Sequence, residues 1–169
     1  MSFREVAVDT IQENFIQSIG SEWMLITAGN QSGYNMMTAS WGFAGVMWGA
    51  PTAIAAIRPQ RYTMEFVERE GYYTLSFYGE NKKLHGVCGK QSGRDIDKTA
   101  ETGLTPLFDE ETGAPYFAEA RLVLICKKVY CQPLSSEGFC DPTLADANYA
   151  AGDYHNMIYG KIVKALVRE

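Results

Sequence analysis

The stretch Asn35-Met-Met-Thr-Ala-Ser-Trp-Gly-Phe-Ala-Gly-Val-Met-Trp48 contains no charged residue, and it alternates small polar residues with large apolar ones. This alternation predicts a strand with two different faces: Met37, Ala39 and Trp41 on one, and Met36, Thr38 and Ser40 on the other. The first face can enter a core, and the second offers hydroxyls and backbone to a flat, polar ligand. Glycines at 42 and 45 permit a bend or a close approach. A buried strand that ends in a glycine turn is the alternative that needs no ligand.

Length and composition indicate one globular domain over residues 1–169. The chain is 46% apolar and 21% charged, which is ordinary for a domain with a substantial core. Its net charge of −5 disfavours a nucleic-acid surface, which needs clustered basic residues.

The segment Thr27–Ile57 has no charge and is long enough to span a bilayer. It includes Pro51 and five glycines, so strands joined by turns are the better interpretation. The charged segment Met1–Asp9 lacks the apolar centre of a signal peptide. We therefore expect a soluble, cytoplasmic protein without a membrane partner.

The four cysteines are Cys88, Cys126, Cys131 and Cys140. None forms a CxxC pair, and the chain has only two histidines, so no metal site is expected. Without an export signal we expect buried free thiols rather than disulfides.

The remaining pattern predicts a mainly β domain. Strands are expected at 23–28, in the Asn35 segment, and at 52–57, 72–77, 120–134 (bent near Lys127) and 154–167. Helices are expected at 10–19 ending at Gly20, at 63–69 capped by Thr63 or its neighbours, at 81–87 and at 141–151 capped by Asp141. About six strands with short connections favour a small antiparallel barrel with three to five short helical insertions.

Three segments place polar groups on this apolar frame: Asn35–Gly42, Arg58–Thr63 and Gly89–Lys98. Gly89-Lys90 is not a P-loop, because its first glycine would fall at Leu84 and Gln91 replaces the Ser or Thr. Cations beside hydroxyls and glycine amides can bind a phosphate, and the apolar residues of the first segment can pack on a ring. A mononucleotide-like cofactor would satisfy both, although each segment also has a purely structural explanation.

The sequence resembles the flavin reductase-like, FMN-binding split-barrel family, and within it the flavoredoxin branch. The resemblance covers about residues 20–165 and rests on four motifs in the expected order: Asn35–Gly42, Arg58–Thr63, Ser92-Gly-Arg-Asp-Ile-Asp-Lys98 and His155-Asn-Met-Ile-Tyr-Gly-Lys-Ile162. It implies a Greek-key-like split barrel that forms a homodimer with FMN at or near the interface. It also implies electron transfer from NADH, NADPH or a protein donor.

The resemblance also implies the cofactor contacts. Thr38 to Trp41 would line the isoalloxazine ring, and Arg58, Arg61, Tyr62 and Thr63 would serve the ribityl-phosphate side. The full expected set is Asn35, Met37, Thr38, Ala39, Ser40, Trp41, Arg58, Arg61, Tyr62, Thr63, Cys88, Gly89, Lys90 and Ser92.

His155 is the substrate-side candidate, since an imidazole could hydrogen-bond the flavin edge or a nicotinamide. A structural histidine at the start of a strand is the alternative. Cys88 could be a redox thiol or a packed cysteine. No GxGxxG follows a strand, so a Rossmann nucleotide site is not expected.

Two other functions use the same fold. One is a non-catalytic flavin-binding or redox-sensing module, and the other is an FMN oxidase of the pyridoxamine-phosphate type. The identity of the donor and acceptor stays open. The uncharged segment Phe43–Trp48 is more apolar than a monomer's surface usually is, which predicts a symmetric dimer that buries it.

Overall fold

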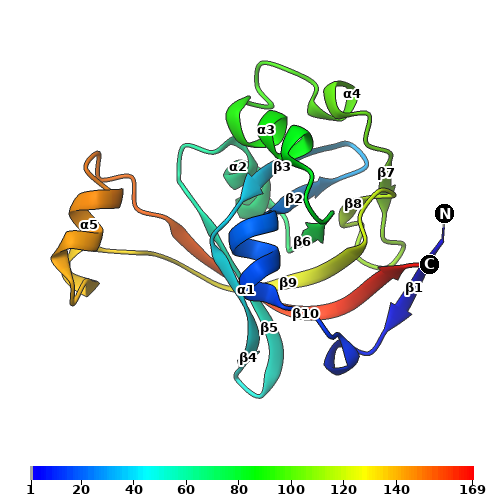
Figure 1. The fold of residues 1–169 in the computed structure, drawn as a ribbon, viewed down its shortest axis with the longest axis horizontal. Helices are drawn as coiled ribbons and strands as arrows, with labels where there is room; N and C mark the ends of the chain where they lie inside the picture. The colour runs from blue at the N-terminus through cyan, green and yellow to red at the C-terminus, as the bar shows by residue number, and fades with distance from the viewer. Residues whose placement is uncertain (1) are drawn as a thin grey trace.

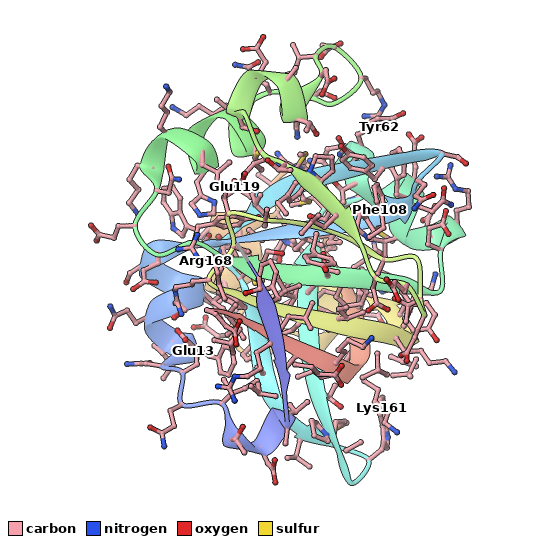
Figure 2. The ribbon with its side chains drawn as sticks, turned by 90° about the vertical axis from the view of Figure 1, so that its right-hand side faces the viewer. Glu13, Tyr62, Phe108, Glu119, Lys161 and Arg168 are labelled. Atoms are coloured by element: carbon pink, nitrogen blue, oxygen red, sulfur yellow. The ribbon has the colours of Figure 1, made fainter. Side chains whose placement is uncertain are left out.

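The computed structural model describes residues 2–169 and is dominated by one antiparallel sheet of eight strands (Figure 1). The strand order is β3-β2-β6-β9-β10-β5-β4, with β1 paired to β10 (Figure 2). The strands are β1 (Phe3–Val6), β2 (Met24–Asn30), β3 (Gly33–Ala39), β4 (Gly42–Met47), β5 (Ala50–Ile57), β6 (Tyr72–Phe77), β9 (Leu122–Pro133) and β10 (Asn156–Arg168). β7 (Pro106–Phe108) and β8 (Pro115–Phe117) form a separate hairpin.

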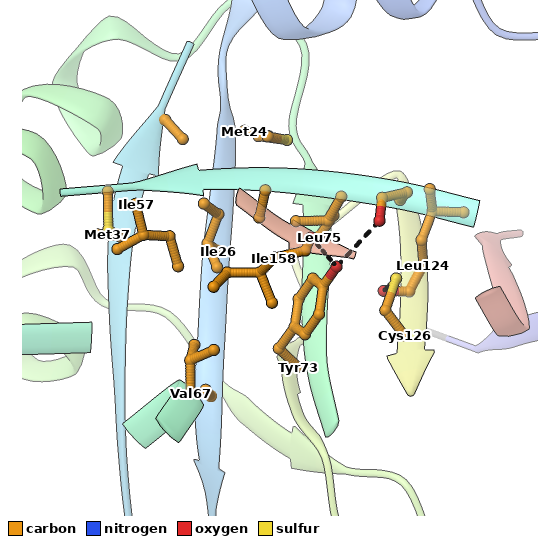
Figure 3. Packing of buried hydrophobic residues seen from close by; sticks show 14 of the residues in the cluster. Met24, Ile26, Met37, Ile57, Val67, Tyr73, Leu75, Leu124, Cys126 and Ile158 are labelled. Atoms are coloured by element: carbon orange, nitrogen blue, oxygen red, sulfur yellow. Dashed lines mark hydrogen bonds between the residues drawn. The ribbon is translucent and has the colours of Figure 1, made fainter. Parts of the chain in front are cut away.

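The sheet curls around a core without closing, so the predicted mainly β split barrel is confirmed. Inside it, Tyr73 of β6 reaches across to β5 and β10, and its hydroxyl lies 3.1 Å from the carbonyl oxygens of Ala53 and Ile158 (Figure 3). Gly160 permits this approach, because a Cβ there would lie 2.5 Å from the Tyr73 hydroxyl.

The helices are short and lie mostly at the sheet's upper end and edges (Figure 1). They are η1 (Val8–Thr10), α1 (Phe15–Gln17), η2 (Ser18–Glu22), α2 (Tyr62–Arg69), α3 (Lys82–Lys90), α4 (Lys98–Thr102), η3 (Ser136–Gly138) and α5 (Pro142–Asn148). α2 packs on β2 and β3, and α3 packs on β3. No helix within residues 2–169 has both the length and the hydropathy needed to cross a bilayer.

Two segments project from the barrel in Figure 1. One is the β4–β5 hairpin. The other, which we call the arm, is residues 134–154 between β9 and β10, and it carries α5. Asp141 caps α5 by accepting from the Thr143 amide, as predicted.

Several predicted strands are confirmed: β6 matches at both ends, and β2, β9 and β10 match with shifts of one or two residues at their ends. β9 contains an irregularity at Val129, next to the predicted bend, because Tyr159 pairs with Tyr130 while Gly160 pairs with Lys128.

Other predictions are wrong. Residues 11–14 are not helical, and the helical turns continue past Gly20 to Glu22. The Asn35 strand ends at Ala39, so Trp41 lies outside it, and β4 begins at Gly42. On the second predicted face Met36 is buried in an apolar cluster that includes Leu84 and Cys88 of α3, whereas Thr38 and Ser40 are half-buried.

Thr63 does not cap α2. It lies inside the helix, whose N-cap residue is Arg61 without a side-chain cap bond. The residues described form more strands than the predicted six, because β1, β7 and β8 were not expected and the Asn35 segment forms two strands, β3 and β4. Cys131 and Cys140 are exposed, so burial of the thiols is correct only for Cys88 and Cys126.

Candidate functional site

Three cavities adjoin one another through shared lining residues, and we call them together the groove. A polar cavity of about 230 Å³ lies between α2 and the α3–α4 connection, and a central cavity of about 270 Å³ lies beside the end of β3. An apolar cavity of about 490 Å³ lies between α1, the start of β4 and the arm. Arg61 lines both the polar and the central cavity, whereas Trp41 and His155 line both the central and the apolar cavity.

The polar cavity concentrates positive charge in a protein that is acidic as a whole. Arg61, Lys90 and Lys98 all line it, and none of them forms an ion pair with a carboxylate of residues 2–169. Arg94, which also lines it, is paired with Glu65. Three cations without a counterion provide charge for a phosphate.

Backbone carbonyls at the end of α3 hold two of these cations. Arg61 donates to the carbonyl oxygen of Gly89 (2.8 Å), and the Lys98 ammonium donates to those of Cys88 (3.1 Å) and Met36 (2.8 Å). A helix C-terminus favours cations, because its last carbonyls lack partners within the helix. Burial together with the charge of Arg61 lowers the pKa of Lys98 to about 8.

A buried polar clamp forms the floor of this cavity. The side-chain amide of Asn35 in β3 donates to the hydroxyl of Thr63 in α2 at 2.7 Å. Gly93 lies directly above it, since a Cβ there would come within 1.9 Å of the Asn35 side-chain oxygen. Glycine at 93 is therefore required for the loop to reach this position.

The end of β3 forms one wall of the central cavity through Thr38, Ala39, Ser40 and Trp41. Thr38 is fixed from behind, because its hydroxyl donates to the carbonyl oxygen of His85 in α3 at 2.9 Å. The Gly89 backbone lies against Thr38, with a Cβ at 89 reaching 3.4 Å from the Thr38 Cβ. The β3 end and the α3 end are thus packed together as one wall.

The apolar cavity contains one ordered polar pair. The His155 ring lies 4.9 Å from the Trp41 ring, and its Nδ1 is 2.8 Å from the Tyr149 hydroxyl. Phe15 and Ile19 close the opposite side. Burial, helped by the charge of Arg58, lowers the pKa of His155 to about 4, so its ring is neutral at neutral pH.

Arg58 has different hydrogen-bonding partners from Arg61, although only two residues separate them in the sequence. Its guanidinium pairs with Asp153, donates to the carbonyl oxygen of Asn148 (2.9 Å) and lies over the Tyr149 ring. Arg58 therefore anchors the arm and lines the central cavity, away from the polar one.

Most residues expected from the sequence lie along this groove. The polar cavity is lined by Asn35, Met37, Arg61, Tyr62, Thr63, Lys90 and Ser92, and the central cavity by Met37, Thr38, Ala39, Ser40, Trp41, Arg58, Arg61 and His155. Cys88 lines neither. Its side chain is fully buried, and burial raises the pKa of its thiol to about 11. Because its thiol is protonated and enclosed, Cys88 is a packing residue. Its backbone carbonyl accepts a hydrogen bond from Lys98.

Sequence reasoning missed three contributors: Lys98, Tyr149 and Phe15. Lys98 ends the Ser92–Lys98 motif and could have been included on that ground. Tyr149 and Phe15 carried no local signal, because distant segments bring them to the groove.

The donor set fits a nucleotide-like group with one phosphate and one flat ring. Unpaired cations, a hydroxyl and a glycine loop surround the polar end, and aromatic side chains surround the other.

Comparison with known proteins agrees with this geometry. The flavin reductase like domain matches residues 16–169, so the chain is a split barrel that belongs to the flavin reductase-like family. No curated protein matches the chain.

Solved structures are similar in fold at low identity. A flavoredoxin from Methanosarcina acetivorans is 21% identical with a TM-score of 0.69, over 88% of this chain and 69% of that one. An FMN-binding domain of a flavin reductases-like enzyme from Shewanella baltica OS155 is 18% identical with a TM-score of 0.70, over 98% and 77%. An NADH:FAD oxidoreductase from Streptomyces globisporus C-1027 is 16% identical with a TM-score of 0.65, over 87% and 75%.

Proposed function

We propose that this protein binds FMN in the groove and passes electrons through it from NADH, NADPH or a reduced protein partner. The observation that carries the proposal is the polar cavity, in which Arg61, Lys90 and Lys98 have no carboxylate partner among residues 2–169. This cavity adjoins the central one, which in turn adjoins the apolar cavity with its aromatic walls. The family membership and the flavoredoxin and NADH:FAD oxidoreductase folds support it.

In this proposal the phosphate lies at the polar end. Arg61, Lys90 and Lys98 supply charge, Thr63 and Ser92 supply hydroxyls, and the 92–94 loop supplies backbone amides. Thr38 to Trp41 pack along the ring. Bound FMN supplies the redox chemistry, and the chain supplies position, electrostatics and exclusion of water.

A flavin titration tests the proposal. Purified protein is stripped of any bound flavin and titrated with FMN while flavin fluorescence is recorded. We expect saturation near one FMN per chain and weaker binding of riboflavin, which lacks the phosphate. Absence of saturable quenching by FMN would overturn the cofactor assignment.

Anaerobic mixing separates the candidate functions. The FMN-loaded protein is mixed with NADH or NADPH, and flavin absorbance is followed. Rapid bleaching by one nucleotide is the outcome for a reductase. No bleaching by either nucleotide would contradict direct NAD(P)H oxidation and leave a protein-fed carrier or a non-catalytic module. Bleaching by pyridoxamine phosphate instead would indicate the oxidase.

We also propose that a second copy of the chain covers the β4–β5 hairpin. Phe43, Val46, Met47 and Trp48 are exposed there, and Trp48 lies 5.7 Å from Tyr159 and 6.3 Å from the half-exposed Tyr130. We call these exposed apolar side chains the hairpin patch, and soluble monomers seldom expose so many large apolar groups on one projecting segment. Because it adjoins the groove, a partner seated on it would lie near the cofactor.

Light scattering at micromolar concentration tests this, with a dimeric mass expected. Val46→Asp should yield a monomer, because it places a charge inside the interface. Leu144→Asp is the matched control, since Leu144 is an exposed apolar residue on the arm away from the patch. A monomeric native protein would contradict the assembly.

A further inference from the structure

The arm contributes Tyr149 to the apolar cavity, and the hydroxyl of Tyr149 contacts His155. The Tyr149 hydroxyl is 2.8 Å from His155 Nδ1, and both residues are more than nine-tenths buried. His155 Nε2 makes no hydrogen bond to residues 2–169, yet it is not enclosed, and His155 lines both the central and the apolar cavities. One ring nitrogen is therefore held by the protein, and the other is available to the groove.

The direction of the hydrogen bond follows from its surroundings. A neutral imidazole has one donor and one acceptor nitrogen. If Nδ1 carried the proton, the phenol proton of Tyr149 would have no acceptor among the described residues, and leaving it unsatisfied in a buried site is costly. If Tyr149 donates to Nδ1, both groups are satisfied and the proton lies on Nε2.

The arm holds Tyr149 in place through several contacts. Its ring stacks on Tyr154 at 4.7 Å, and the Arg58 guanidinium lies over it at 5.2 Å. Arg58 is itself fixed by Asp153 and by the Asn148 carbonyl. The phenol is therefore held in position before any ligand enters.

We propose that Tyr149 is a positioning residue that fixes His155 as the Nε2–H tautomer and so presents a neutral hydrogen-bond donor to the groove. Such a donor, between Trp41 and an apolar cavity, suits the carbonyl oxygen of an uncharged planar group such as a carboxamide, an aldehyde or a ketone. This ligand class rests on the proposed function, whereas the tautomer does not.

Nitrogen-15 NMR of the two histidines in the flavin-free protein tests the tautomer at pH 7. A His155→Gln variant assigns the signals, since His85 is the other histidine. We expect a protonated Nε2 and an unprotonated Nδ1 for His155. Tyr149→Phe should convert this pattern to a mixture of tautomers, because Nδ1 loses its donor.

Tyr154→Phe is the matched control, because it removes a phenol from the same stack that makes no hydrogen bond to His155. It should leave the His155 pattern unchanged. An Nδ1–H tautomer in the native protein, or equal changes in the two variants, would overturn the proposal. The native spectrum decides the tautomer even if a variant fails to fold.

Kinetics test the ligand class. In the FMN-loaded protein, Tyr149→Phe should raise KM for the reduced nucleotide several-fold while kcat and FMN affinity change little. Tyr154→Phe should change none of these. A loss confined to FMN affinity would contradict the carbonyl role, whereas failure of FMN to bind the native protein would remove the proposed function and leave the tautomer result intact.

Discussion

The two ends of the groove are built in different ways. At the polar end the protein's own backbone holds the charges, because the carbonyls at the end of α3 orient Arg61 and Lys98 without neutralising them. At the apolar end aromatic side chains from α1, β4 and the arm form the walls, and the Tyr149–His155 hydrogen bond orders its polar groups. Carbonyl partners keep a cation available for an anionic ligand, whereas a carboxylate partner would satisfy it.

Arg58 and Arg61 show this difference within one short segment. Arg58 is paired with Asp153 and stabilises the arm, whereas Arg61 has carbonyl partners and remains uncompensated. The same residue type therefore serves structure at one end of the segment and is available for binding at the other.

The sharpest test of the comparison removes the charge at the polar end. Arg61→Ala should weaken FMN by about 1.5–3 kcal/mol, or roughly ten- to a hundred-fold, because a charge-assisted phosphate contact is lost. Riboflavin lacks the phosphate and should bind nearly as before. Both affinities are measured by fluorescence titration.

Arg94→Ala is the control, because Arg94 lines the same cavity but is paired with Glu65. We expect it to change FMN affinity little. Equal losses of FMN and riboflavin in Arg61→Ala would show that this cavity is not the phosphate site.

A smaller effect is expected from pH, through Lys98. Its pKa is about 8 in the free protein, and a bound phosphate, which is dianionic above pH 7, should raise it. Binding then takes up a proton above pH 8, so FMN affinity should fall about tenfold between pH 7 and pH 9. Titrations across this range in Lys98→Met should show a much flatter dependence.

Through Lys98, the free energy of unfolding should depend on pH in the opposite direction to FMN affinity. Unfolded lysine has a pKa of about 10.4, so the unfolded chain binds more protons between about pH 8 and 10.4. The contribution of Lys98 to the free energy of unfolding of the flavin-free protein should therefore rise with pH in this window and be absent in Lys98→Met. An unchanged pH dependence of FMN affinity in Lys98→Met would assign the titration to another group.

The smallest effect is expected at the apolar end. Trp41→Ala should weaken FMN and riboflavin equally, by about 0.5–1.5 kcal/mol or roughly two- to tenfold, because both carry the ring and Trp41 is already 43% exposed. Phe43→Ala serves as a control for general damage to this end, since Phe43 lines the apolar cavity but not the central one. If Trp41→Ala weakened the binding of FMN but not of riboflavin, Trp41 would lie beside the phosphate and not beside the ring, which would reverse the proposed orientation of the cofactor.

Local sequence predicted much of the fold. Residue type placed most strands to within a few residues, as at β6, because aromatic and β-branched side chains suit a pleated sheet. The helix expected over 10–19 is wrong for residues 11–14, because apolar spacing cannot distinguish a helix from an irregular segment whose turns are set by packing. Here Arg121 of the 118–121 turn binds Glu13 and Glu22 and fixes that segment.

The sequence by itself determined a mainly β fold, the glycine-permitted turns and the three polar segments, since these depend on residues that are near neighbours. Only the tertiary structure decided which cations remain without a carboxylate, since Asp153 reaches Arg58 across 95 positions of chain, and Glu65 reaches Arg94 across 29. It likewise decided that Tyr149 meets His155 beside Trp41. Whether a cation lacks a carboxylate partner, and which ring nitrogen of His155 carries the proton, depend on distances between segments. No local sequence pattern encodes those distances.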